Sequence, residues 1–316
     1  MTSFSKRHPI FHLSPSTSNG LKLLSAIMVV LTHYARYIWE NHLSDSIIYH
    51  VLCCFGGFFA VALFFFLSGY GLMESEKRKH LNFLPYIKKR LVKVYFPAFL
   101  ITFLWLPISS VLLNEDLTDG FRYLFWGFND SAMWFIEAIM VLYIIFGVFI
   151  QLLYKMRKAL SLLCLAAMTI VAIAFCLCFI QGTFSVISIP MFVIGVMTSM
   201  CNDSVRKMRG VLASVIGWGL GMTAFTYLWD TPYAKYAVMT YASFLIVMLI
   251  LWIWDIDLKA KCWTIAGVLS FDIYLVHNKV LTVMTSAHQD ASLLYYGLWV
   301  AVFTIGFYYL RKAIKV

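Results

Sequence analysis

Long apolar stretches, separated by short polar segments, run along almost the whole chain. A helix needs about 20 mostly apolar residues to cross the hydrocarbon core of a membrane. Ten stretches approach this length: 21–39, 49–73, 91–113, 132–153, 159–180, 186–201, 210–229, 235–254, 263–286 and 293–311. The sixth is the weakest, because it is short and contains Pro190 and Gly195. All are continuously apolar, which indicates helices and argues against alternating strands. We therefore expect an all-α integral membrane protein, a bundle of about ten transmembrane helices.

The charges between these stretches predict an orientation. Basic side chains gather in the N-terminal segment, in alternate loops and in the C-terminal tail, at 6–7, 77–90, 155–158, 206–209, 259–261 and 311–315. The loops at 40–45, 115–130 and 181–188 are acidic or neutral, although Asp255 and Asp257 dilute one basic loop. Since cytoplasmic loops carry the excess of Lys and Arg, both termini are expected in the cytoplasm. Residues 1–20 then form a cytoplasmic segment, and residues 21–316 form one membrane domain.

Composition agrees with this pattern. The chain is 62% hydrophobic and 13% charged, whereas a soluble domain carries roughly twice that charged share. The net charge of +10 does not indicate nucleic-acid binding, because the basic residues lie in short loops between apolar stretches. Residues 1–19 lack the apolar core of a cleavable signal peptide. We expect a multi-pass protein of the cell membrane, surrounded by the lipid bilayer and without a nucleic-acid partner.

The seven cysteines predict neither a disulfide framework nor a metal site. They lie within or at the ends of apolar stretches, at positions 53, 54, 164, 176, 178, 201 and 262. Their number is odd, and their spacing lacks the CxxC or Cys/His pattern of metal ligands. We expect reduced packing residues and no bound metal.

The first stretch contains three ionisable side chains, which are costly in lipid. Lys22 lies at its cytoplasmic start, and His33 follows about 16 Å further toward the outside. The eleven helical steps between them return to within about 20° of the starting direction, so both side chains share one face. Lys22 and Arg36 can reach opposite membrane surfaces by snorkelling, whereas the shorter His33 cannot. Because an imidazole exchanges protons near neutral pH, we expect a functional role for His33.

The fourth stretch carries a carboxylate in its outer half. Glu137 follows Trp134 by one turn and has Ile, Phe, Met and Ala as neighbours. A carboxylate there must be neutralised, paired or hydrogen-bonded. It either forms a salt bridge with Arg36 or Lys279, or it orients a histidine or shares its proton.

The ninth stretch carries a polar face. Ser270, Tyr274 and His277 are spaced four and three residues apart and lie on one side of a helix. This face either lines a site or binds neighbouring helices. Asp272 and Lys279 lie on the other side and are interpreted as packing or anchoring charges.

The depth of three side chains predicts a cavity. His33, Glu137 and His277 come from three separate stretches, and all reach the outer half of the membrane. Random placement would scatter them in depth. We therefore expect one water-accessible cavity that opens outward.

A dense basic segment lies at the opposite, cytoplasmic side. It brings Lys88, Lys89, Arg90 and Lys93 to the inner end of the third stretch. These cations either fix topology and contact anionic lipid headgroups, or hold the phosphates of a nucleotide-like donor.

Taken together, these segments resemble the acyltransferase 3 family of ten-span membrane acyltransferases. The matches are Lys22 and His33 with ten residues between them, "FFFLSGYGLM" (64–73), "KKRLVK" (88–93) with Pro97, "WFIEAIMVLY" (134–143) and "SFDIYLVH" (270–277). The family typically has arginine where Lys22 and Lys93 stand; lysine keeps the charge but loses the bidentate fork. Many members carry a hydrolase-like domain after the last span, so this chain is expected to be a stand-alone form.

The resemblance implies an activity. An acyl group, most often acetyl, would move from cytoplasmic acyl-CoA to a hydroxyl of a surface or lipid-linked glycan outside. No cofactor would be bound, since acetyl-CoA or another acyl-CoA is the donor substrate. His33 would act as general base or as a transiently acylated nucleophile, and Glu137 would orient it or stabilise its charge. The expected substrate-binding residues are Lys22, Lys89, Arg90, Lys93, Ser68, Tyr70, Trp134, Tyr274 and His277.

Two other classes of function fit some of these features. A proton-coupled transporter or exporter of a small polar molecule also places ionisable residues and a helix break such as Pro190/Gly195 inside its spans. A scaffold or sensor would show neither transport nor acyl transfer. The sequence does not identify the acceptor or the acyl chain.

Overall fold

The computed structural model describes residues 11–114, 116–118, 133–179, 186–228, 234–254, 256, 262–287 and 292–315. The α-helices and π-helical turns (η) with bounds in these ranges are α1 (Pro15–Glu40), α2 (Ile47–Val51), η1 (Leu52–Gly56), α3 (Gly57–Arg78), α4 (Phe83–Arg90), η2 (Leu91–Tyr95), α5 (Phe96–Leu113), α7 (Trp134–Leu153), α8 (Lys158–Phe179), α9 (Pro190–Cys201), α10 (Val205–Leu228), α11 (Ala234–Trp254), α12 (Cys262–Ala287) and α13 (Leu293–Ala313). No strand occurs in these ranges, which confirms the predicted all-α fold. Residues 1–10 and the predicted loop residues 119–130, 181–185 and 257–261 lie outside the described part of the chain.

Ten helical units in the described ranges correspond to the ten predicted spans. The segments α2, η1 and α3 form one unit of 32 residues, and α4, η2 and α5 form another of 31 residues. Eight units are long and apolar enough to cross a membrane: α1, α2–α3, α4–α5, α7, α8, α10, α11 and α13. Of the other two, α12 has 26 residues but carries a polar face, and α9 has 12 residues. The chain is a multi-pass membrane protein.

Several helices begin at residues that differ from the predicted span limits, and α1 and α9 show why. α1 starts at Pro15, where the Ser14 hydroxyl accepts the Thr17 N–H at 3.1 Å and caps the helix. α9 starts only at Pro190, within the predicted span 186–201. A proline suits a first helical turn because its ring fixes φ and its missing N–H has no partner there.

Large apolar side chains cover the outside of the bundle. Strongly exposed examples are Leu163 and Val171 on α8, Leu220 on α10 and Ile253 on α11. Such a surface would cause association in water but is the ordinary lipid-facing surface of a membrane protein. The exposure pattern therefore agrees with the hydropathy of the spans.

Two long units contain a π-helical turn. η1 interrupts the α2–α3 unit, and η2 interrupts the α4–α5 unit. In η2 the Phe96 N–H bonds the Leu91 carbonyl, five residues back, and the next residue, Pro97, has no N–H to donate. Turns of this kind occur often at functional sites, and both lie beside cavities described below.

The centre of the bundle is formed by α1, α3, α9 and α12. α1 packs along α12 and α3, and α3 packs along α9. Gly69 and Gly195 allow α3 and α9 to touch: a Cβ at Gly69 would stand 2.1 Å from the Phe192 carbonyl oxygen, and one at Gly195 would stand 2.2 Å from that of Phe66. The two backbones are therefore in direct contact, which fixes the position of α3 behind α1.

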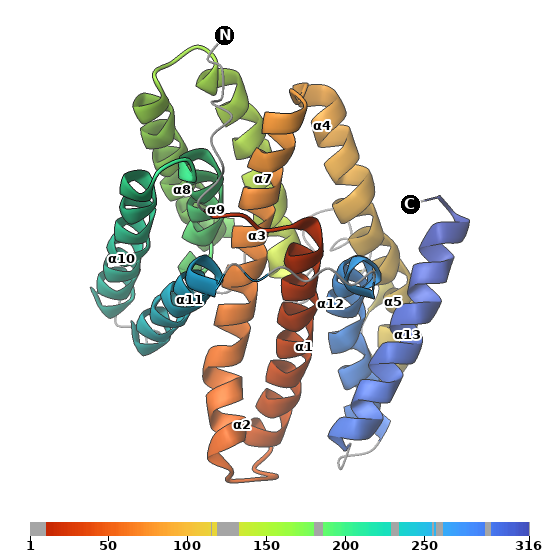
Figure 1. Ribbon diagram of the computed structural model, residues 1–316. Coiled ribbons are helices and arrows are strands. Elements are labelled where there is room, and N and C mark those ends of the chain that lie inside the picture. The colour runs from red at the N-terminus through yellow and green to blue at the C-terminus, as the bar shows by residue number, and fades with distance from the viewer. Residues whose placement is uncertain are drawn as a thin grey trace.

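The ends of the described chain lie on one half of the bundle (Figure 1). α1 runs from near the centre down to the connection with α2, and α13 returns upward to the C-terminus. We call the half that holds the termini the terminal side, and the half that holds α2 the α2 side. The assignment of the terminal side to the cytoplasm remains a prediction from the charge of the loops.

Candidate functional site: two cavities that meet at Tyr274

Two histidines from different helices meet inside the bundle. The ring centroids of His33 on α1 and His277 on α12 lie 4.7 Å apart, with the planes at 69°. The His277 side chain is fully buried, and its Nδ1 lies 2.6 Å from the Tyr274 carbonyl oxygen. Because a carbonyl only accepts, Nδ1 carries the proton, and the neutral ring then has its lone pair on Nε2. The Tyr296 hydroxyl of α13 donates to the His277 carbonyl at 3.2 Å and fixes the helix at this point.

His33 opens into a small cavity on the α2 side of this pair, which we call the histidine cavity. Its volume is about 60 Å³, enough for a few water molecules. Its lining comes from α1, η1, α3, α7, α12 and the segment before α9: Val29, Thr32, His33, Arg36, Cys53, Gly57, Phe58, Val61, Trp134, Ser188 and Tyr274. Arg36 supplies a cation here, and its Nε lies 3.8 Å from Glu40.

A larger cavity lies on the terminal side, and we call it the basic cavity. Its volume is about 630 Å³. Its lining residues are Lys22, Phe64, Ser68, Arg90, Lys93, Val94, Phe135, Ile139, Tyr143, Gly267, Val268, Ser270, Phe271, Tyr274, Tyr308, Arg311 and Lys312. Five of these side chains are cations, contributed by α1, the α4–η2 junction and α13. This concentration of positive charge suits a ligand with several anionic groups.

The guanidinium of Arg90 is held against two aromatic rings. It lies 5.4 Å from the ring centre of Tyr86 and 5.1 Å from that of Tyr143. The buried Tyr86 hydroxyl donates to the Tyr143 carbonyl at 3.2 Å, which ties α4 to α7. A planar guanidinium in such a setting keeps its charge while losing freedom of movement. Sequence reasoning selected Arg90 but not the two tyrosines that position it.

A buried ion pair stands at the wall of the basic cavity. Arg311 Nη2 on α13 lies 2.6 Å from Asp272 Oδ2 on α12. Asp272 is 0% exposed and Arg311 is 9% exposed. From their positions in the sequence, Asp272 was expected to be a packing or anchoring charge, and Arg311 a basic residue of the C-terminal tail. The sequence signal that could have revealed this pair was Asp272, an acidic side chain inside an apolar span.

Tyr274 belongs to the lining of both cavities. The residue is 4% exposed. Its ring lies 5.3 Å from that of Phe135, 6.4 Å from that of Phe64 and 5.7 Å from that of His277. Because these rings pack around it, Tyr274 forms the partition between the basic cavity and the histidine cavity.

The structure brings most of the predicted site residues to these two cavities. Lys22, Ser68, Arg90 and Lys93 line the basic cavity. His33 and Trp134 line the histidine cavity, with His277 packed against His33 and Tyr274 at the partition. The basic residues thus line one cavity and the histidine pair lies at the other, but Glu137, predicted to share the cavity of the two histidines, lines neither.

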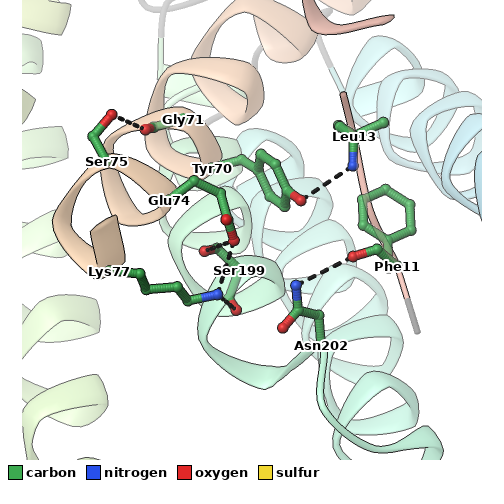
Figure 2. A network of polar contacts seen from close by, with 9 residues as sticks. All are labelled: Phe11, Leu13, Tyr70, Gly71, Glu74, Ser75, Lys77, Ser199 and Asn202. Carbon is green, nitrogen blue, oxygen red and sulfur yellow. Dashed lines mark hydrogen bonds and ion pairs between the residues drawn. The ribbon is translucent and has the colours of Figure 1, made fainter. Parts of the chain in front are cut away.

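Three predicted residues lie elsewhere. Lys89 is exposed at the end of α4 and lines neither cavity. Glu137 is half-buried on α7, within electrostatic range of the Cys176 thiol on α8, and also lines neither cavity. Tyr70 also lines neither cavity, and its hydroxyl faces Leu13 of the N-terminal segment (Figure 2).

Figure 2 shows what Tyr70 does in the fold. Its buried hydroxyl accepts the Leu13 N–H at 3.2 Å, and the Asn202 amide donates to the Phe11 carbonyl at 3.2 Å. These bonds attach the segment before α1 to α3 and to the end of α9. Nearby, Ser199 donates to Glu74 at 2.7 Å and reinforces the contact between α3 and α9. The geometry indicates a structural role for Tyr70.

The arrangement suits proton transfer and anion binding. His33 lines a cavity with room for a few water-sized groups, and the basic cavity lies beyond Tyr274. Among the described residues, no group of three or more His, Cys, Asp or Glu side chains could hold a metal ion.

Comparison with known proteins agrees with this geometry. The model of one protein family, described as an acyltransferase domain (Acyl_transf_3), matches residues 17–311. No match was found among curated proteins or among solved structures. The matched region covers nearly the whole chain and every described lining residue of the two cavities except Lys312, and the chain therefore belongs to the acyltransferase 3 family of membrane acyltransferases.

Proposed function

We propose that the protein transfers an acyl group, typically acetyl, from cytoplasmic acyl-CoA to a hydroxyl of a surface or lipid-linked glycan on the other side of the membrane. One observation carries the proposal: a basic cavity and a histidine cavity adjoin at a single side chain, Tyr274. Family membership supports the acyltransferase activity, and the two cavities support a donor and an acceptor that arrive from opposite sides.

The donor occupies the basic cavity. Its phosphates contact Lys22, Arg90 and Lys93, which line that cavity on different helices. The pantetheine arm extends along α1 past Phe64 and Tyr274. α1 is helical throughout, so Lys22 and His33 are separated by about 16 Å, which is on the order of the length of that arm.

The acceptor hydroxyl occupies the histidine cavity. A ring nitrogen of His33 takes the hydroxyl proton while the hydroxyl oxygen attacks the thioester carbonyl carbon. The carbon–sulfur bond then breaks, and the CoA thiolate takes the proton from His33. The products are the ester and free CoA. His277 supports His33 through the edge contact between their rings, and its own proton stays on Nδ1, facing the Tyr274 carbonyl.

The size of the histidine cavity supports a small acyl group. About 60 Å³, bounded by Phe58, Trp134 and Tyr274, leaves little room for a long chain beside an acceptor hydroxyl. The glycan acceptor rests on family resemblance, and Arg36 at the same cavity is available for an acidic or hydroxyl group of that acceptor.

The test uses purified protein in lipid nanodiscs with radiolabelled acetyl-CoA. We expect release of CoA to depend on the wild-type protein, and His33→Asn to lower the rate by about 10²–10⁴-fold, the usual contribution of a general base. The matched control is His42→Asn, the same substitution at an exposed position in the α1–α2 connection. Turnover that survives His33→Asn would contradict the role of His33.

The acceptor is identified in cells. Mass spectrometry of surface glycans from cells with and without the gene should show the loss of one acetyl group per modified sugar. Movement of a small polar molecule across proteoliposomes without consumption of acetyl-CoA would instead support the transporter interpretation.

A further inference from the structure

The end of α13 turns an arginine into the bundle. α13 lies at the edge of the structure (Figure 1), and most of its side chains near the C-terminus are exposed. Arg311 is the exception, since it is 9% exposed and lines the basic cavity. Its neighbour Lys312 lines the same cavity from the exposed side of the helix. A basic residue that only sets topology has no reason to leave the membrane surface.

Asp272 holds this arginine by one end of its guanidinium. Nη2 donates to Asp272 Oδ2 at 2.6 Å. The two residues lie on different helices and are 39 positions apart in the chain. In the described part of the protein, the buried Arg311 Nε and Asp272 Oδ1 have no hydrogen-bond partner. Buried ion pairs are normally retained with their remaining polar atoms satisfied. The free Nε of a fixed guanidinium therefore indicates a missing anionic partner.

The charge of the basic cavity points in the same direction. Its described lining holds Lys22, Arg90, Lys93, Arg311 and Lys312, and Asp272 is the carboxylate paired with this set. Five cations and one carboxylate leave a formal excess of four positive charges. Arg90 Nε also has no hydrogen-bond partner among the described residues. Such an excess of positive charge, with Arg311 buried and Lys22 and Arg90 partly buried, favours a polyanionic ligand.

Four of the cations come from two different parts of the fold. Arg90 and Lys93 come from the α4–η2 junction, whereas Arg311 and Lys312 come from α13. One phosphate cannot satisfy both groups if they lie on different walls of a cavity of about 630 Å³. The CoA moiety carries two separated anionic groups, a diphosphate and a 3′-phosphate, with about four negative charges near neutral pH because a phosphomonoester has a second pKa near 6.

We infer that Arg311 is a donor-binding residue that contacts a phosphate group of the acyl-CoA, and that Asp272 is the positioning residue that aims it. The inference rests on the proposed function. α13 thereby forms a second phosphate-binding wall, and the site selects a donor with two anionic groups over a donor with one, such as a phosphopantetheine thioester. Nη2 faces Asp272, and Nε faces a phosphate oxygen.

The experiment measures dissociation constants by calorimetry on the full-length protein in nanodiscs. The ligands are CoA, dephospho-CoA and pantetheine, which lacks both the diphosphate and the 3′-phosphate. The variants are Arg311→Gln and, as the matched control, Arg78→Gln at the exposed end of α3. We expect Arg311→Gln to weaken CoA binding about tenfold or more, as for loss of a charge-assisted hydrogen bond. The control should remain within about twofold of wild type.

The truncated ligands identify the phosphate. If Arg311 contacts the 3′-phosphate, its substitution has no effect on dephospho-CoA binding. If it contacts the diphosphate, the effect persists with dephospho-CoA and disappears with pantetheine, which carries no phosphate. An equal penalty for all three ligands, or a CoA affinity equal to that of Arg78→Gln, overturns the inference while CoA binding itself still supports the proposed function. No CoA binding by the wild type overturns both.

The positioning role of Asp272 is tested by a measurement that a purely structural effect of the substitution would leave unchanged. Asp272→Asn should raise the KM for acetyl-CoA about tenfold while kcat at saturating donor stays within about twofold, because the histidine cavity is unchanged. If the single variant does not fold, the pair Asp272→Asn/Arg311→Gln removes both buried charges and should fold. That double variant should bind CoA no more weakly than Arg311→Gln alone. A lowered kcat with unchanged KM would assign Asp272 to structure only.

Discussion

The imidazole of His33 stands edge-on against the imidazole of His277, with 4.7 Å between the ring centroids. The two residues lie on α1 and α12, the helices that pack closely along the centre of the bundle. Two imidazolium cations at this distance would repel each other, so the pair is suited to hold one transferred proton. Since His277 directs its Nδ1 at the Tyr274 carbonyl, His33 is the member that exchanges a proton with the cavity.

His277 should affect the chemical step and not donor binding. His277→Phe keeps a ring against His33 but removes both nitrogens, so the plane of His33 is less well fixed. We expect kcat to fall by about tenfold to a hundredfold, the usual effect of a small misplacement of a reacting group, with the KM for acetyl-CoA nearly unchanged. Steady-state kinetics in nanodiscs measure both constants.

The control for this variant is His50→Phe. His50 lies on α2, and its ring centroid is 4.5 Å from that of Trp39. It lines neither cavity. It should behave as wild type. A larger change in KM than in kcat for His277→Phe would contradict the assignment.

Tyr274 should prevent wasteful hydrolysis. Tyr274→Ala removes the partition between the basic cavity and the histidine cavity, so water gains access to the thioester. We expect acceptor-independent hydrolysis of acetyl-CoA to rise several-fold relative to transfer, as for any opened active site. Tyr274→Phe keeps the ring and should keep hydrolysis low. Release of CoA with and without acceptor gives the ratio, and equal ratios in the two variants would show that Tyr274 is not the barrier.

The fold could be predicted from sequence because its determinants lie along the chain. Continuous apolar stretches marked all ten helical units, and charged loops separated them. The π-helical turns were not predicted; η2 depends on how Pro97 and its neighbours adjust within a long helix, and η1 carries no comparable sequence signal. The early start of α1 could have been found from Ser14 and Pro15, which are a cap and a first-turn proline.

Site residues could be predicted only where their relative positions follow from the geometry of a single helix. Lys22 and His33 share a face of α1, and helical geometry places them in depth. The pairing of Asp272 with Arg311 depends on how α12 and α13 pack, which periodicity does not show. Tyr70 was selected because it belongs to a motif, yet the structure turns it toward Leu13. The orientation of the Tyr70 side chain depends on where the N-terminal segment packs in the folded protein, which the sequence of α3 does not show.

The crossing of α3 and α9 should tolerate no side chain at its two glycines. Gly69→Ala places a Cβ 2.1 Å from a carbonyl oxygen of α9, and backbone cannot move aside as a flexible side chain can. We expect a loss of at least about 1–3 kcal/mol in unfolding free energy, the usual cost of overpacking. Thermal unfolding in detergent measures the loss.

A glycine with open surroundings supplies the contrast. Nothing lies within 4 Å of a Cβ added at Gly217 on α10. Gly217→Ala should therefore raise the unfolding free energy by about 0.5–1 kcal/mol, through helix propensity alone. If Gly69→Ala and Gly217→Ala unfold at the same temperature, the close approach of α3 and α9 is contradicted.

The hydrogen bond from Tyr154 to the buried carboxylate of Glu76 should contribute to the stability of the fold. Glu76 is 1% exposed at the end of α3, where it accepts the Leu81 N–H at 2.8 Å and the Tyr154 hydroxyl just beyond α7. Burial and this carboxylate raise the pKa of the Tyr154 phenol above its ordinary value, so the hydroxyl stays protonated and donates. Tyr154→Phe removes that donor and should lower the unfolding free energy by about 0.5–1.5 kcal/mol. Tyr227→Phe, at an exposed position on α10, should leave the unfolding temperature unchanged. Equal unfolding temperatures for the two variants would show that the Tyr154 hydroxyl does not stabilise the junction between α3 and α7.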